Sequence, residues 1–279
     1  MPELPEVETV RKALKKKLLN RTIKDINIVY SNIFEGQDLD FINKNIKNQS
    51  INDIKRRGKW IIFVLDDFYL LSHLRMEGKY VYRDIGSKIE KHEHVIFNID
   101  NQFELRYKDV RKFGRMYFVY KNELLTKTPL KDLGLEPWDK DLDCNYLREK
   151  YKLKSIPIKT ALLDQSIITG IGNIYADEIL FLSKINPYEK PKDLNDVDLD
   201  NIINNTRKVL DKAIEEGGTT IRSYTSEEGV SGLFQNELLV HKHEGDKCLI
   251  CGSIIRRDKI NGRSSYYCIK CQKRKNISC

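Results

Sequence analysis

The stretch CLICGSIIRRDKINGRSSYYCIKC, residues 248–271, contains two Cys-x2-Cys pairs separated by sixteen residues. Two short turns that present four thiolates to one ion are typical of tetrahedral zinc. Four cysteines complete the coordination shell and leave no position open for a substrate, so the predicted metal is one structural Zn²⁺. Four unmetallated thiols are the alternative, and they would leave a small module with almost no core. The predicted ligands are Cys248, Cys251, Cys268 and Cys271.

The same end of the chain is strongly basic. The 279 residues carry a formal net charge of +8, and residues 248–279 contain eight Lys or Arg against one acid, Asp258. That segment therefore carries a formal net charge of +7, which falls to about +5 once four thiolates bind one divalent ion. A compact basic module favours a polyanionic partner, with nucleic acid first. A solvated, solubilising tail is the alternative.

The region before this module has the pattern of a linker followed by helices. Pro129, Gly134 and Pro137 predict a linker over 128–143, and residues 144–216 are helical in character. The clearest helix is 195–216, which ends before Gly217 and Gly218. Residues 217–236 are polar and glycine-rich, which predicts a mobile loop. His241 and His243 are expected on the surface, because four cysteines already complete the metal shell.

Residues 22–120 show a different pattern, with short apolar or alternating runs rich in Ile, Val, Tyr and Phe. Such runs with short polar breaks predict strands. Their close spacing leaves no room for crossover helices, so we expect antiparallel pairing in a sandwich or barrel. The longest apolar run is WIIFVL, residues 60–65, which is too short to span a membrane.

The chain begins MPELPEVETV, and residues 3–19 predict one amphipathic helix with apolar residues on one stripe. Pro2 has two interpretations. It is either the first residue of that helix, with acidic neighbours that suit the helix N-terminus, or, after removal of Met1, a free secondary amine beside the carboxylate of Glu3. The N-terminus lacks the apolar region of a secretory signal.

Two further motifs are weak when each is considered alone. TGIGNIYADE, residues 169–178, lacks the third glycine of a dinucleotide fingerprint and predicts a tight turn with Asn173 as the N-cap of a helix. Such a helix end binds phosphate, or it is an ordinary capped helix. DVRKFGR, residues 109–115, would place a charge and a ring in a loop where they could wedge into DNA. A Phe in a loop is more often part of a core.

Taken together, the motifs resemble the bacterial formamidopyrimidine-DNA glycosylase family, in order and with similar spacing from residue 1 to about 274. They are MPELPEVETV, RRGKW (56–60), LSHLRMEGKY (71–80), KHEHVIF (91–97), DVRKFGR, LLDQSIITGIGNIYADE (162–178), GGTTIRSY (217–224), GLFQNEL (232–238) and GRSSYYCIKCQ (262–272).

The resemblance implies a bifunctional base-excision-repair enzyme that removes oxidised purines, chiefly 8-oxoguanine and formamidopyrimidines, from duplex DNA and then cuts the abasic strand by β,δ-elimination. Pro2 is then the nucleophile at C1′, forming a Schiff base, and Glu3 is the general acid and base. An α-amine titrates near ~8, so an appreciable fraction is neutral at pH 7. A chain that retains Met1 would have no free Pro2 amine and no lyase activity.

Other roles are implied residue by residue. Lys59 would act at the phosphate or in proton transfer during elimination, and Arg263 would hold the phosphate and help δ-elimination. Glu6, Glu77 and Ser223 would support or border the base pocket. Lys152 and Lys159 compete with Lys154 for the same alignment. The expected DNA contacts are His73, His92, Lys154 and Asn173, together with Met76, Arg111 and Phe113, which would form the wedge that fills the gap left by an everted base. A core Met76 and a core Phe113 are the alternatives for two of the wedge residues.

The resemblance also implies an α+β multidomain fold: an N-terminal helix with an antiparallel β-sandwich (1–130), a helical helix–two-turn–helix domain with the lesion loop (131–236), and a four-cysteine zinc finger (237–279). The expected protein is a cytoplasmic monomer on double-stranded DNA that contains oxidised purines or abasic sites. VHKHEGDKC (240–248) and Leu233 depart from the usual pattern, which affects details of the lesion loop.

Three other functions fit part of the sequence. An endonuclease VIII-type glycosylase for oxidised pyrimidines is the nearest, but Leu4 and the Arg111–Phe113 pair resemble the purine enzyme. A zinc-finger DNA-binding protein without catalysis would need no free amine at Pro2. Zinc-ribbon RNA binding has no support from the N-terminal half.

Overall fold

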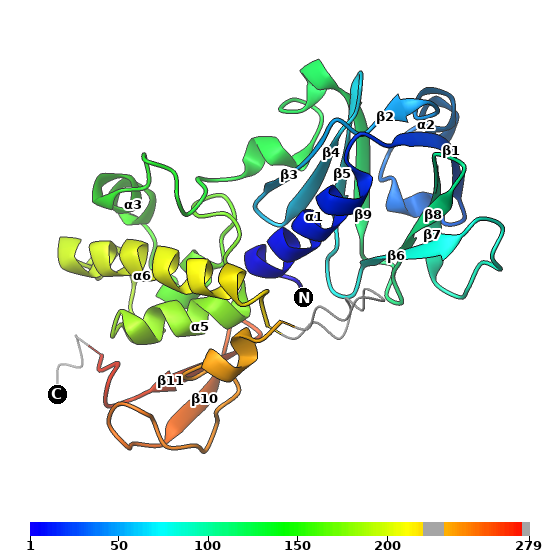
Figure 1. The fold of residues 1–279 in the computed structure, drawn as a ribbon. Coiled ribbons are helices and arrows are strands. Elements are labelled where there is room, and N and C mark those ends of the chain that lie inside the picture. The colour runs from blue at the N-terminus through cyan, green and yellow to red at the C-terminus, as the bar shows by residue number, and fades with distance from the viewer. Residues whose placement is uncertain (220–231, 275–279) are drawn as a thin grey trace. The chain divides into compact units, whose positions relative to one another are not determined.

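The computed structural model describes residues 1–219 and 232–274. The chain divides into two compact units, Met1–Lys131 with Gly217–Gly232, and Asp132–Glu216 with Leu233–Cys279 (Figure 1). Ser223, and most of the loop predicted over 217–236, lie outside the described residues.

The first unit begins with helix α1, Leu4–Leu18, which matches the helix predicted over 3–19. Val7, Val10 and Leu14 lie on its buried stripe, since residues three and four apart share a helix face. Glu3 is the N-cap and forms a capping box with Glu6. Pro2 therefore precedes the N-cap, so its interpretation as the first helical residue is wrong.

Two antiparallel sheets follow α1. One has the order β2-β1-β7-β8-β6 and the other β3-β4-β5-β9. Their inner faces and the apolar stripe of α1 form one hydrophobic core, to which Phe97 and Tyr107 contribute from the first sheet and Phe63 and Phe118 from the second. The strands are β1 (Thr22–Ile28), β2 (Gln49–Ser50), β3 (Asp53–Arg57), β4 (Trp60–Val64), β5 (Phe68–His73), β6 (Lys79–Asp84), β7 (Glu93–Ile99), β8 (Phe103–Lys108) and β9 (Arg115–Tyr120).

The apolar runs of residues 22–120 all form strands, and their antiparallel pairing is confirmed. The sequence pattern missed β3 because its residues, DIKRR, are mostly charged and only Ile54 is buried. It also missed the short helix α2, Leu39–Asn45. Neither element has an apolar pattern of its own, so both form because neighbouring segments of the fold pack against them.

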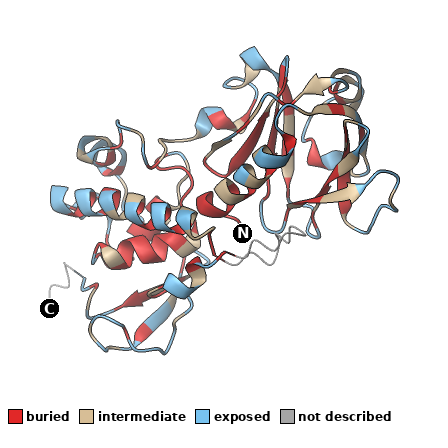
Figure 2. Ribbon diagram, viewed as in Figure 1, coloured by how far each residue is buried: buried red, intermediate tan, exposed pale blue. Residues whose placement is uncertain are grey.

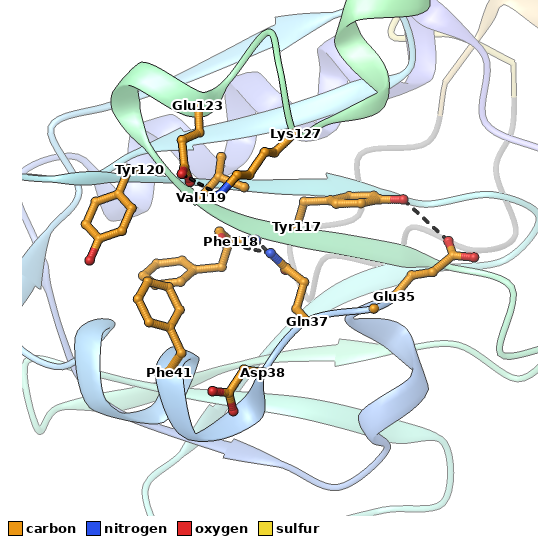
Figure 3. Close-up of a pocket in the computed structure, with 11 residues that line it drawn as sticks. Glu35, Gln37, Asp38, Phe41, Tyr117, Phe118, Val119, Tyr120, Glu123 and Lys127 are labelled. Atoms are coloured by element: carbon orange, nitrogen blue, oxygen red, sulfur yellow. Dashed lines mark hydrogen bonds and ion pairs between the residues drawn. The ribbon is translucent and has the colours of Figure 1, made fainter.

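The outer edge of β9 is covered by a side chain. The Gln37 amide donates to the Phe118 carbonyl at 2.8 Å and accepts from the Phe118 N–H at 2.6 Å, which replaces a strand partner (Figure 3). Beside it lies a cavity of about 440 Å³ that includes Tyr117, Tyr120 and Glu123 in its lining. None of the residues predicted for function lines this cavity. The Gln37 side chain pairs part of an edge strand that would otherwise be open.

The second unit contains α3 (Cys144–Tyr151), α4 (Ile158–Leu162), α5 (Asn173–Leu182) and α6 (Asp196–Glu215), followed by the hairpin of β10 (Ile255–Ile260) and β11 (Arg263–Cys268). The 195–216 prediction agrees with α6, which Asn195 caps. Helix α5 is buried over Tyr175–Phe181 and forms the centre of this unit (Figure 2). Short 3-10 turns occur at Ser31–Ile33, Lys121–Glu123, Pro129–Asp132, Pro191–Asp193 and Phe234–Glu237. Within the described ranges, no helix is long and apolar enough to cross a membrane.

Candidate functional site

The N-terminal residues of the first unit are held in place by buried carboxylates. Pro2 is buried and Glu3 is 2% exposed. The Glu3 N–H donates to Glu6 Oε2 at 2.8 Å, and Glu6 Oε1 accepts from the N–H and hydroxyl of Thr219 at 2.9 and 3.1 Å. Glu6 therefore joins the N-terminus to residue 219, at the start of the glycine-rich segment. A Cβ on Gly218, which has φ +81°, would lie 2.8 Å from Glu6 Oε1, so only glycine fits this approach.

Close to this N-terminus, the structure gathers the residues predicted to form the wedge. Met76, Arg111 and Phe113, the predicted wedge, line one cavity of about 360 Å³ together with Met1, Arg75 and Arg115. The Arg111 guanidinium lies 4.6 Å from the centre of the Phe113 ring. Phe113 is 46% exposed and Met76 37%, so their alternative interpretation as core residues does not hold. Large apolar side chains beside cations in an open cavity fit a stacked nucleic-acid base.

Lys59 and His73 lie near each other at one end of the second sheet. Lys59 is 6% exposed and directly precedes β4, where Trp60 pairs with His73 of β5. The Trp60 and His73 rings are 4.8 Å apart and meet edge to face. The Arg75 N–H donates to His73 Nδ1 at 3.0 Å, so this nitrogen is an acceptor and the imidazole is neutral. His73 thus supports the turn before Met76.

We predict that His73 makes this unit sensitive to acid. Burial, with Arg75 and Lys59 nearby, lowers the pKa of His73 from 6.5 to about 3. Between those two values the unfolded chain binds a proton that the folded chain does not, so stability falls as the pH drops from 6.5 toward 3. The loss amounts to at most roughly 1.4 kcal/mol per pH unit.

The variant His73→Asn keeps an acceptor for the Arg75 N–H but cannot take up this proton. Its melting temperature should therefore fall less than that of the unmodified chain between pH 7 and pH 5. His243→Asn, at a histidine whose side chain is 40% exposed, is the matched control. Identical pH dependence in His73→Asn and the unmodified chain would contradict the prediction.

His92 and Glu77 are placed on two loops of the first unit. His92 precedes β7 in a turn with φ +73°, and its carbonyl accepts from the Asp109 N–H at 3.0 Å. Glu77 is exposed, next to Met76. A positive φ at a residue other than glycine is held by the surrounding structure and is common at functional turns.

In the second unit, side chains of α4 and α5 donate hydrogen bonds to one backbone carbonyl of the C-terminal hairpin. Ser264 O accepts from Asn173 Nδ2 at 3.0 Å and from Lys159 Nζ at 2.7 Å. The preceding residue, Arg263, is exposed at the start of β11. Gly172, not Asn173, is the N-cap of α5, which corrects the sequence-based assignment. Because Asn173 is the first helical residue, its side chain is not used for capping and binds the hairpin instead.

The three competing lysines have different surroundings. Lys154 is partly exposed and pairs with Asp164 at 3.3 Å, and Lys152 is exposed and pairs with Glu149. Lys159 is 1% exposed and pairs with Asp177 at 2.7 Å. Lys159 is therefore committed to the interior of the second unit, whereas Lys152 and Lys154 are exposed or partly exposed.

The four cysteines fit one tetrahedral zinc ion. Their sulfur atoms all lie within 4.8 Å of one another, with 3.8 Å between Cys248 and Cys271 and 3.4 Å between Cys251 and Cys268. Zn–S bonds of about 2.3 Å in a tetrahedron give sulfur separations of about 3.8 Å. Hydrogen bonds from Ser253 lower the pKa of Cys251 to about 6, whereas burial raises the pKa of Cys268. Four neighbouring thiols cannot all ionise unless a cation neutralises them.

His241 contradicts its predicted surface position. It is 6% exposed, and its Nδ1 lies 2.8 Å from Asp177 Oδ2. Glu178 accepts from the N–H groups of residues 239, 240 and 241 at 2.8–3.0 Å. Sequence reasoning missed Asp177 and Glu178, although two acids within the apolar run of α5 were a signal that they are buried and paired. His243, in contrast, lies at the surface as predicted, with 40% of its side chain exposed.

Comparisons with known proteins match this arrangement along the chain. Family models match residues 1–116 (formamidopyrimidine-DNA glycosylase N-terminal domain), 133–225 (formamidopyrimidine-DNA glycosylase H2TH domain) and 245–274 (zinc finger found in FPG and IleRS). The fold and site thus define a zinc-finger protein of the helix–two-turn–helix class.

Curated relatives and solved structures align with nearly the whole length of this chain. Formamidopyrimidine-DNA glycosylase of Oceanobacillus iheyensis is 42% identical over 99% of both chains, and that of Ligilactobacillus salivarius is 44% identical over 98% of this chain and 99% of the other. Lactococcus lactis Fpg, solved as a mutant with DNA that contains Fapy-dG, has a TM-score of 0.91 and 38% identity, covering 98% of this chain and all of the other. The chain belongs to the formamidopyrimidine-DNA glycosylase family.

Proposed function

We propose that this protein is a base-excision-repair DNA glycosylase and abasic-site lyase that removes oxidised purines from duplex DNA. The observation that carries this function is the full-length match, at a TM-score of 0.91, to Lactococcus lactis Fpg in complexes with DNA that contains Fapy-dG or an abasic site. A MutM complex with DNA that contains carbocyclic 8-oxo-G matches at a TM-score of 0.90. The buried N-terminal pair of Pro2 and Glu3 is the arrangement that this chemistry needs.

The proposed reaction begins after removal of Met1, which frees the Pro2 nitrogen. The neutral amine attacks C1′ of the damaged nucleotide, the bond from C1′ to the base breaks, and the base leaves with a proton supplied by a general acid. The amine then loses its proton, and the C1′–O4′ bond breaks as O4′ takes up a proton, which gives a charged iminium and makes the 2′ proton acidic. Glu3 is proposed to supply and accept these protons, because it is adjacent to Pro2 and buried.

Elimination needs cationic groups at the phosphates. We propose Lys59 for phosphate contact or proton transfer during elimination, and Arg263 for holding the phosphate during δ-elimination. His73, His92, Lys154 and Asn173 are proposed as DNA contacts. Met76, Arg111 and Phe113 are proposed to fill the space of the everted base, because these three line one open cavity. Glu77 and Ser223 are proposed to border the base pocket, with Glu6 supporting the site.

One structural Zn²⁺ held by the four cysteines organises the C-terminal module when bound. It leaves no open coordination position, so this module positions Arg263 rather than activating a water. We propose the domain division 1–130, 131–236 and 237–279, and a monomer bound to double-stranded DNA. We also propose a bacterial cytoplasmic location, associated with the nucleoid through DNA, because the substrate is DNA and the similar proteins are bacterial.

Oxidised pyrimidines are the second candidate substrate class. The observation in its favour is a Lactococcus lactis Fpg complex with DNA that contains an oxidised pyrimidine, at a TM-score of 0.90 and 37% identity. A test compares single-turnover excision of 8-oxoguanine opposite cytosine with excision of 5-hydroxycytosine opposite guanine in the same duplex sequence. We expect the purine to be removed at least ~10-fold faster, which corresponds to about 1.4 kcal/mol of differential transition-state stabilisation. Faster removal of the pyrimidine would assign the other specificity, and no cleavage of either duplex by processed protein would overturn the proposed function.

A further inference from the structure

One buried carboxylate holds the turn that carries Arg111 and Phe113. Asp109 is 1% exposed, and its two oxygens accept from the Arg111 N–H at 3.0 Å and the Gly114 N–H at 2.8 Å. Between these two bonds, Lys112 has φ +57°. A lysine in the left-handed region is strained, so the turn depends on the two bonds to Asp109 to keep its shape.

The backbone of Asp109 connects the same turn to the His92 turn. The Asp109 N–H donates to the His92 carbonyl at 3.0 Å, and the Asp109 carbonyl lies 2.7 Å from His94 Nε2. Asp109 follows β8 directly, and His92 precedes β7, which pairs with β8. One residue thus uses all its polar groups to join two exposed segments of the first unit.

A third contact brings in the loop that carries Met76. The Tyr107 hydroxyl lies where a Cβ on Gly114 or Gly78 would be, at 1.9 and 2.1 Å from the ideal Cβ positions. Gly78 follows Met76 and Glu77, and its N–H donates to the Leu74 carbonyl at 2.9 Å. Both turns therefore pack against the same buried ring of β8, and their glycines allow that close approach.

We infer that Asp109 is a positioning residue for lesion recognition, which fixes Arg111 and Phe113 in the orientation that enters the DNA and holds them in register with His92. This inference rests on the proposed function. Asp109 itself is buried and touches no substrate, so its effect passes through the exposed residues. A turn without both Asp109 bonds would present the Phe113 ring in several orientations, and a misplacement of about 1 Å in a positioning group can cost roughly 100-fold in rate.

The test follows wedge insertion and excision separately. Insertion is followed by the fluorescence of 2-aminopurine placed beside a tetrahydrofuran abasic analogue, which needs no catalysis. Excision is followed on 8-oxoguanine opposite cytosine under single-turnover conditions. We expect Asp109→Ala to slow excision about 10- to 100-fold and to reduce the 2-aminopurine response. Asp109→Asn keeps one acceptor oxygen and should show a smaller loss.

The matched control is Asp100→Ala. Asp100 also holds a turn with its carboxylate, accepting from the Thr22 N–H at 2.8 Å and pairing with Arg21 at 3.1 Å, but it lies before β8, at the opposite end of that strand from Asp109. Its excision rate should stay within about 2-fold of the unmodified chain. Thermal melting of both variants reports any general loss of folding, and Asp109→Asn replaces Asp109→Ala if the latter does not fold.

A double-mutant cycle with Phe113→Ala decides between positioning and a purely structural role. If Asp109 acts through the wedge, Asp109→Ala should slow excision by less than about 3-fold when Phe113→Ala is already present. The inference would be overturned if Asp109→Ala slowed excision by the same factor with and without Phe113→Ala, or if the Asp109 and Asp100 variants slowed it equally. If the unmodified protein inserts its wedge but excises no lesion, the proposed function fails, whereas the 2-aminopurine comparison still tests Asp109.

Discussion

Processed protein should form a covalent adduct with abasic or 8-oxoguanine DNA in the presence of borohydride, and a form that retains Met1 should form none. With Met1 in place the Pro2 nitrogen is an amide, which cannot form an iminium. Processed Pro2→Gly presents a primary amine that titrates in the same range, but its imine is charged only when protonated. We expect its adduct yield and strand cleavage to fall by at least ~100-fold, or about 2.7 kcal/mol.

The measurement is trapping of labelled DNA followed by intact-mass analysis, which reports both the processing of Met1 and the adduct. Pro5→Ala is the matched control, since Pro5 lies within the first turn of α1 and should keep the adduct. Lys59→Ala tests the competing amine. An adduct that persists in Pro2→Gly but disappears in Lys59→Ala would show that the nucleophile is Lys59 and not the N-terminus.

The second large effect is expected at the metal. The apolar cluster around the C-terminal hairpin consists of Phe181, Val240, Cys248, Ile255 and Cys268, so two of its five buried members are metal ligands. With so small a core, zinc supplies most of the folding free energy, and structural sites of this kind contribute about 10–16 kcal/mol on binding. Cys268→Ala should therefore lose the ion and unfold the β10–β11 hairpin.

Loss of that hairpin removes the Ser264 carbonyl that Lys159 and Asn173 bind, and it releases Arg263. We expect the affinity for abasic-analogue duplex to fall by at least ~100-fold at fixed salt, since phosphate contacts dominate such binding. Cys144→Ser is the matched control, because Cys144 bonds to Asp200 at 2.8 Å and lies outside the cluster. Metal content by mass spectrometry and binding by fluorescence anisotropy check both variants. Unchanged affinity in a zinc-free Cys268→Ala protein would contradict the prediction.

Local sequence determined the regular elements and the metal ligands. Short segments contain the spacing of four cysteines, the apolar stripe of α1 and the strand runs from β4 to β9. Such features can be recognised locally, because a thiolate turn, a 3.6-residue period and an alternating run need no distant partner. The same segments carried the resemblance to the family. Strand β3 was missed, since five mostly charged residues form a strand only when β4 and α1 lie beside them.

Tertiary structure decided which polar residues are buried and what they hold. His241 was predicted on the surface because four cysteines already complete the metal shell, but it is buried and paired with Asp177 of α5. Asp109, Glu178 and Lys159 look like ordinary charged residues in the sequence, yet each is buried and satisfies partners that are 2 to 105 positions away along the chain. A buried charge is stable only with such partners, and which residues become partners is set by the packing of sheets and helices, not by any local pattern.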